Sequence, residues 1–169
     1  MEHVDPRREH EVSLGRLLTN MLSLEMLLRL YLFYKEPTPD SHKFQLDSLR
    51  EGDIVSENYF TNTCGLRNLI EKYNTYCKTN FSELKIDPDL ADIRNALAHG
   101  RVLSLDPNFS KIQLFNFVSE KEGQIRLAFA TLMTKDWFQK QIKLFFNAMV
   151  NVHKRIKNDF PKVVGEIES

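Results

Sequence analysis

The segment DIRNALAHGR, residues 92–101, places an arginine, an asparagine and a histidine within six positions and ends close to a glycine. An imidazole can give or take a proton near neutral pH, whereas a guanidinium supplies permanently charged donors that match the oxygens of a phosphate. Cleavage of a phosphodiester bond can use both groups. Arg94 and His99 are therefore the candidate catalytic residues. Asn95, four residues before His99, can hydrogen-bond the imidazole or the scissile group.

A short predicted helix carries these residues. Asp87 is a good N-cap and Pro88 suits the first helical position, so the helix is expected to span roughly residues 88–99. Gly100 is expected to end it in the left-handed conformation that favours glycine. His99 then lies in the last turn, where the helix dipole favours a positive charge.

On a helical wheel of about 100° per residue, this helix has an apolar side and a polar side. The residues assigned to the core are Leu90, Ile93 and Leu97. Two alanines, Ala91 and Ala98, are expected to floor a strip between the arginine and the histidine, where a phosphate or a partner helix could approach the backbone. Asp92 is on the same face as His99 and is an alternative partner that could orient the imidazole.

The longest predicted helix, from about Arg8 to Lys35, is apolar on almost every face. Such a helix needs a central position in a bundle or a second chain against it, and we favour dimerisation. Charged side chains interrupt its apolar run, which argues against a membrane span. Glu25 within it either pairs with Arg94 or occupies an exposed edge, and both interpretations stay open.

An acidic connection and a second helix are predicted next. Residues 36–58 contain six acids against one lysine and one arginine, and they include two prolines and a candidate helical turn at residues 44–49. The second helix is expected from Tyr59 to about Thr79, with Cys64 and Cys77 as core residues. No zinc-binding or disulfide spacing accompanies these cysteines.

The region after Gly100 is predicted to form strands and then a last helix. Residues 111–119 and 124–131 alternate apolar with polar side chains, which is typical of a β-hairpin, and residues 101–105 suggest a further strand. The last helix is expected to begin after Thr134 and to end at Pro161. Its excess of lysine and arginine could bind an RNA backbone, although a solvated face is the commoner meaning.

Three phenylalanines of the predicted strands have two interpretations. They could stack bases, as aromatic side chains do in RNA-binding sheets, or they could pack in the core, which is the simpler interpretation. The residues are Phe115, Phe117 and Phe129.

Composition indicates one globular domain over residues 1–169. The chain is 42% hydrophobic and 27% charged, and its 23 lysines and arginines balance 23 acids, so it has no strongly basic nucleic-acid footprint. The charged N-terminal segment lacks the order of a secretory signal, and we expect a cytoplasmic protein with reduced thiols. Neither a cofactor nor a metal site is indicated.

The sequence RNALAHG, from Arg94 to Gly100, resembles the R-x(4)-H motif of the HEPN superfamily, with Asn95 as the polar residue that usually follows the arginine. The predicted helical frame, with the motif before the last long helix, is also similar to that family. The resemblance implies a mainly α fold, a HEPN-like up-and-down helical bundle, here with an inserted β-hairpin before the last helix.

The resemblance also implies an activity. Many HEPN proteins are metal-independent endoribonucleases acting as toxins or in phage defence, and they dimerise so that two motifs face one cleft. The 2′-hydroxyl of RNA then attacks the adjacent phosphate, while His99 of each copy handles protons and Arg94 stabilises the charge on phosphorus. The alternative is a non-catalytic HEPN module that binds a nucleotide or docks a partner such as a nucleotidyltransferase-type antitoxin.

Overall fold

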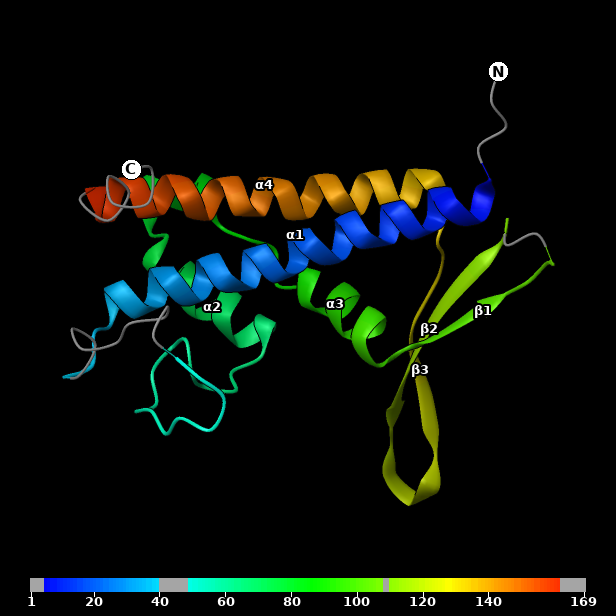
Figure 1. The fold of residues 1–169 in the computed structure, drawn as a ribbon, viewed down its shortest axis with the longest axis horizontal. Helices are drawn as coiled ribbons and strands as arrows, with labels where there is room; N and C mark the ends of the chain where they lie inside the picture. Colours follow the sequence, from blue (N-terminus) through cyan, green and yellow to red (C-terminus); the bar gives the residue numbers. More distant parts are fainter. Residues whose placement is uncertain (1–4, 40–48, 108–109, 162–169) are drawn as a thin grey trace. The chain divides into compact units, whose positions relative to one another are not determined.

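The computed structural model describes residues 5–39, 49–107 and 110–161. These residues form four α-helices and one three-stranded antiparallel sheet that precedes the last helix (Figure 1). The chain is therefore mainly helical with a small sheet, as the sequence predicts. None of the helices in these three ranges is both long and apolar enough to cross a membrane.

The bounds of the elements agree with most of the sequence prediction. The helices are α1 (Pro6–Lys35), α2 (Leu66–Tyr76), α3 (Leu90–His99) and α4 (Lys135–Asp159), the short 3-10 helices are η3 (Thr79–Leu84) and η4 (Lys121–Gly123), and the strands are β1 (Arg101–Ser104), β2 (Ile112–Ser119) and β3 (Ile125–Leu132). The hairpin, the further strand and the long first and last helices are confirmed. The candidate turn at residues 44–49 lies almost entirely outside the described residues.

The chain divides into two compact units, and both long helices contribute to each of them. Unit 1 comprises Met1–Leu22 and Asp87–Asn147, and unit 2 comprises Ser23–Ile86 and Ala148–Ser169. The expectation of one domain over residues 1–169 stays a prediction.

In unit 1, the first halves of α1 and α4 pack against each other. The ring of His10 meets the ring of Phe138 edge-on at 5.1 Å, and further along both helices Asn20 Nδ2 donates to the carbonyl oxygen of Ile142 at 3.3 Å. The paired positions advance together, so the two helices run in the same direction here. A strict up-and-down order of four helices would make them antiparallel, and three strands rather than a short loop separate α3 from α4.

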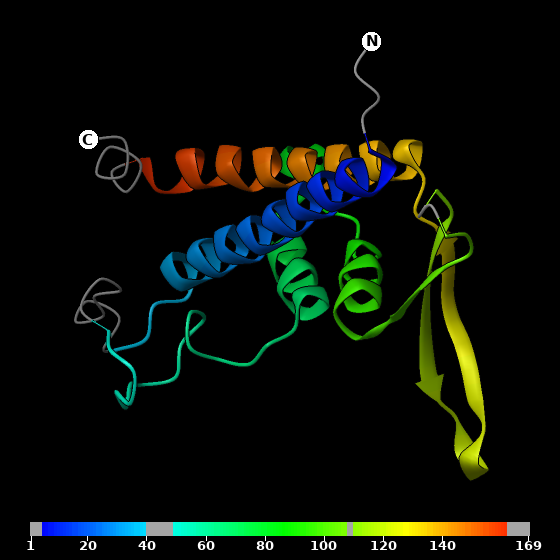
Figure 2. The ribbon, with the colours of Figure 1, turned by 45° about the vertical axis from the view of Figure 1, so that its right-hand side comes forward.

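The sheet of unit 1 has the strand order β1-β2-β3 and follows α3 without a loop, as Figure 2 shows. Arg101, the first residue of β1, pairs with Phe115 of β2. The β2–β3 pairing contains an irregularity between Asn116 and Phe117. Ile112 and Leu114 of β2 are buried. Because α3 ends at His99 and β1 begins at Arg101, the sheet starts directly after the helix that carries the candidate motif.

In unit 2, Tyr31 is central to the core. Its ring lies 5.2 Å from the ring of Tyr73, and its hydroxyl donates to Asp159 Oδ2 at 3.0 Å. Burial and the hydrogen bond to this carboxylate raise the pKa of Tyr31, which keeps its hydroxyl protonated as a donor. Lys35 and Arg155 also pair with Asp159, each at 3.2 Å. One carboxylate thus holds the end of α1 to the end of α4 within this unit.

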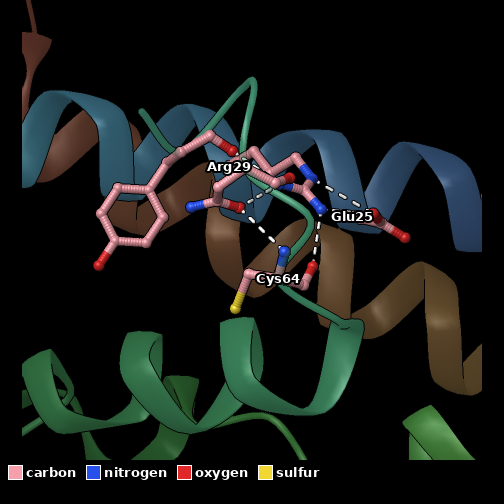
Figure 3. A network of polar contacts seen from close by, with 5 residues as sticks. Glu25, Arg29 and Cys64 are labelled. Carbon is pink, nitrogen blue, oxygen red and sulfur yellow. Dashed lines mark hydrogen bonds and ion pairs between the residues drawn. The ribbon is translucent and has the colours of Figure 1, made fainter. Parts of the chain in front are cut away.

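The second helix begins at Leu66, not at Tyr59 as predicted. The guanidinium of Arg29 in α1 donates to the carbonyl oxygens of Tyr59, at 2.7 Å, and Cys64, at 2.7 Å (Figure 3). The segment before α2 is shaped around this side chain, with its carbonyls turned toward the cation. Cys64 consequently lies outside the helix and is half-buried, whereas Cys77 is buried at its C-terminal cap.

Candidate functional site

The end of α3 presents part of the motif, including Asn95 and His99, to solvent. Asp92, Asn95 and His99 are exposed, and they lie at spacings of three and four residues, which places them on one helix face. Arg94 is half-buried and lies about 100° around the helix from Asn95. The structure therefore brings Asp92, Asn95 and His99 together on an accessible surface of unit 1, whereas Arg94 lies outside that face.

The core side of α3 differs in part from the helical-wheel prediction. Leu90, Ala91 and Ala96 are buried, whereas Ile93 and Leu97 are only half-buried. The helix contacts β2, and two alanines as well as Leu90 are buried on its inner side. The prediction that Ala91 and Ala98 both floor an accessible strip is wrong for Ala91, which is buried. Ala98 is exposed.

The start of α3 lies two residues later than predicted. Asp89 occupies the N-cap position, and the helix begins at Leu90. The carboxylate of Asp87 accepts the backbone N–H of Asp89 at 3.0 Å, and the carbonyl of Asp87 accepts the N–H of Leu90 at 3.2 Å. Asp87 thus stabilises the turn that leads into the helix, which is close to the capping role expected of it.

Gly100 ends α3, but not in the predicted left-handed conformation. Its φ and ψ are −77° and −176°, and its N–H donates to the carbonyl oxygen of Ala96 at 2.8 Å. A Cβ at this position would lie 2.1 Å from that oxygen and 2.4 Å from the carbonyl oxygen of Phe115. Glycine is required because two backbones approach each other here, which lets the chain pass directly from α3 into β1.

An aromatic and basic surface adjoins the end of α3. The guanidinium of Arg101 lies 5.0 Å above the ring of Phe117, and the rings of Phe115 and Phe117 are stacked with centroids 6.2 Å apart. Phe117 is 39% exposed, so the simpler interpretation of it as a core residue is wrong. Sequence reasoning missed Arg101, although its place two residues after His99 at the start of a strand was a usable signal.

Glu25, the predicted supporting carboxylate, takes part in a network of unit 2. Its Oε1 accepts from Arg29 Nη2 at 2.9 Å, and the two side chains are 20% and 11% exposed (Figure 3). The same guanidinium donates to the backbone oxygen and the side-chain oxygen of Asn62, at 3.1 and 2.9 Å. The i, i+4 spacing of Glu25 and Arg29 could have revealed this pair. The suggested pairing of Glu25 with Arg94 stays a prediction.

Comparison with known proteins identifies no relative of this chain. The chain matches no protein-family model, no curated protein and no solved structure. Within the described ranges, no three or more His, Cys, Asp or Glu side chains gather where they could hold a metal ion. The groups on the exposed face of α3 are one imidazole, one amide and one carboxylate, with a guanidinium beside them. Such groups can transfer protons and bind a phosphate.

Proposed function

We propose that the protein is a metal-independent endoribonuclease of the HEPN type, acting in the cytoplasm as a toxin or in phage defence. One observation carries this proposal: α3 ends with Asn95 and His99 exposed one turn apart, and Arg94, next to Asn95 in the sequence, is half-buried. Proton transfer requires an imidazole that the substrate can reach, and an accessible helix end meets that requirement. The HEPN-like bundle is part of the same proposal.

The proposed chemistry uses two copies of the chain, because one imidazole cannot both accept and donate a proton in a single step. His99 of one copy accepts the proton of the 2′-hydroxyl as its oxygen attacks the adjacent phosphorus. His99 of the other copy protonates the departing 5′-oxygen, which leaves a 2′,3′-cyclic phosphate. Arg94 stabilises the additional negative charge on the phosphate oxygens, and Asn95 or Asp92 orients the imidazole.

The surface beside the motif supports RNA as the substrate. A ring such as that of Phe117 can stack a base, a contact typically worth about 1–3 kcal/mol per base. Arg101 above this ring adds a positive charge within the same unit. Arg101 follows the motif directly in β1 and lies above the ring of Phe117, so an RNA strand bound there would lie next to the end of α3.

The exposed surface of α1 supports a homodimer. Three large apolar side chains of unit 1 occupy one face about 120° wide, and they are Val12, Leu18 and Leu22. Leu22 alone is 69% exposed. Gly15 lies on the same face with open space around its Cα, so a second helix could approach closely. A second copy of the chain would remove this apolar surface from water.

Incubation of the purified protein with a structured RNA in the presence of EDTA tests the proposal. We expect cleavage products that end in 2′,3′-cyclic phosphate, and we expect cleavage to be lost in His99→Ala and Arg94→Ala. His153→Ala is a matched control, because His153 is an exposed histidine of α4 outside the motif. RNA that stays intact, or cleavage that persists in both motif variants, would refute the nuclease.

The alternative is a non-catalytic HEPN module that docks a protein such as a nucleotidyltransferase-type antitoxin. The observation in its favour is that the edge strands expose apolar side chains on both faces of the sheet, among them Val102 and Leu103 of β1 and Ile125 and Leu127 of β3. Both are edge strands of the sheet. Intact RNA in the assay, together with a stable complex that Ile125→Lys disrupts, would favour this module.

A further inference from the structure

Arg155 in α4 is a buried cation whose donors are incompletely used. The residue is 6% exposed. Its Nη2 contacts Asp159 Oδ2 at 3.2 Å and the carbonyl oxygen of Tyr76 at 3.4 Å. Nε and Nη1 are buried and have no hydrogen-bond partner among the described residues. Burying a charged group without its hydrogen bonds is costly, and such exceptions in a native fold call for an explanation.

The same guanidinium lines a cavity of about 290 Å³ in unit 2. The other described residues around this cavity come from the end of α2 and the segment after it, and they are Tyr76, Lys78, Asn80 and Phe81. The ring of Phe81 covers one face of the guanidinium at 3.8 Å. Because the N–H bonds lie in the plane of the guanidinium, stacking on Phe81 leaves Nε and Nη1 able to donate.

The charges around the cavity favour an anion. Asp159 is shared between Arg155 and Lys35, so one carboxylate faces two cations. Lys78 adds a further positive charge to the lining, and none of the described lining residues is acidic. A phosphate group carries a charge of about −1.5 to −2 and three acceptor oxygens, which suits two cations with several donors.

We propose that this cavity binds a small phosphate-bearing molecule through Arg155 and Lys78, with Asn80 as an additional hydrogen-bonding group. The phosphate group of the ligand must enter the cavity of about 290 Å³, because a guanidinium that is 6% exposed cannot be reached otherwise. The site shares no residue with the motif of α3 and does not depend on the proposed nuclease. It adds an anion-binding function to unit 2.

Isothermal titration calorimetry with inorganic phosphate, 5′-AMP and adenosine tests this site. The titrations use the wild-type protein and the double variant Arg94→Ala/His99→Ala, which excludes binding at the motif. We expect one saturable site for phosphate and for AMP in both proteins, competition between them, and no binding of adenosine. Equal heats from phosphate and from acetate at matched ionic strength would show that no phosphate site exists.

Three substitutions locate the site. Arg155→Gln is expected to abolish binding, and Lys78→Gln is expected to weaken it about tenfold, as loss of one charge-assisted hydrogen bond does. Lys154→Gln is the matched control, because Lys154 is an exposed lysine of the same helix that does not line the cavity. If Arg155→Gln does not fold, Lys78→Gln and Asn80→Ala decide the matter.

Two results would overturn the proposal. The first is phosphate binding that Lys78→Gln and Arg155→Gln leave unchanged. The second is binding of a short RNA that requires Arg155 while free phosphate and AMP do not bind, since the ligand would then be a nucleic acid and not a small anion. Loss of RNA cleavage in the motif variants with unchanged phosphate binding would leave both this site and the nuclease proposal intact.

Discussion

Replacement of Arg29 by methionine is expected to destabilise the fold strongly, although the residue is outside the proposed active surface. The guanidinium is 11% exposed and donates to five acceptors. These are Glu25 Oε1, the carbonyl oxygens of Tyr59, Asn62 and Cys64, and Asn62 Oδ1. Methionine fills a similar volume but supplies no donor.

The expected loss follows from what the substitution leaves behind. Removing one partner from a buried ion pair typically costs about 3–5 kcal/mol, because the other charge loses its compensation. Here three backbone carbonyls lose a donor as well, so the free energy of unfolding should fall by at least that amount. For a chain of this length, about 3–5 kcal/mol corresponds to a decrease in Tm of roughly 6–20 °C.

Urea denaturation followed by circular dichroism at 222 nm measures this effect, and α1 provides its own control. Arg7 also pairs with a glutamate at i, i+4, Glu11, but its side chain is 63% exposed. Arg7→Met should therefore change stability by less than about 1 kcal/mol. The double variant Glu25→Gln/Arg29→Met should recover only part of the loss, because the carbonyls stay without their donor.

Equal costs for Arg29→Met and Arg7→Met would refute the reasoning. In that case water would replace the guanidinium at the carbonyls of the 59–64 segment at no net cost. The contacts of Arg29 would then not determine that α2 begins at Leu66.

Three further predictions concern other parts of the chain. Gly100→Ala should destabilise by about 1–3 kcal/mol in thermal denaturation, because its Cβ would overlap two carbonyl oxygens. Burial alone would raise the pKa of Asp159, but its hydrogen bonds lower that pKa below the usual value. The ionised carboxylate therefore stabilises the fold above about pH 4, and this stability is lost as the pH falls through the lowered pKa. The Asp159→Asn variant should lose less stability than the wild type between neutral and acidic pH. Leu22→Arg should convert a dimer to a monomer in light scattering while helix content is kept, and a dimer that persists would place the interface elsewhere.

The sequence predicts the elements well wherever the signal is local. The long apolar run of α1, the alternation of β2 and β3 and the cap at Thr134 are all readable from neighbouring residues. The Oγ1 of Thr134 accepts the N–H of Trp137 at 3.1 Å. The failures have distant causes. Tyr59 begins a stretch whose apolar residues have helical spacing, yet its carbonyl oxygen accepts a hydrogen bond from a guanidinium thirty positions away in the sequence.

Gly100 is a second example of a distant cause. A glycine after a helix usually supplies a positive φ, and only the approach of the β2 backbone shows that this one serves a close contact. The motif itself was readable because its residues are local to α3. No pattern of neighbouring residues indicates the predicted pairing of Glu25 with Arg94, whereas the spacing of Glu25 and Arg29 on one helix indicates their ion pair.

Three arginines of this chain show why stability and activity must be measured together. Arg29 is buried and its donors meet acceptors, so its loss should lower stability. Arg155 is equally buried but keeps donors without acceptors, so Arg155→Met should cost less stability than Arg29→Met and should abolish phosphate binding. Arg94 is half-buried in the helix that carries the exposed imidazole of His99, and Arg94→Ala should abolish RNA cleavage with a smaller loss of stability than Arg29→Met. If Arg94→Ala is as destabilising as Arg29→Met, its loss of cleavage would report unfolding and would no longer support catalysis.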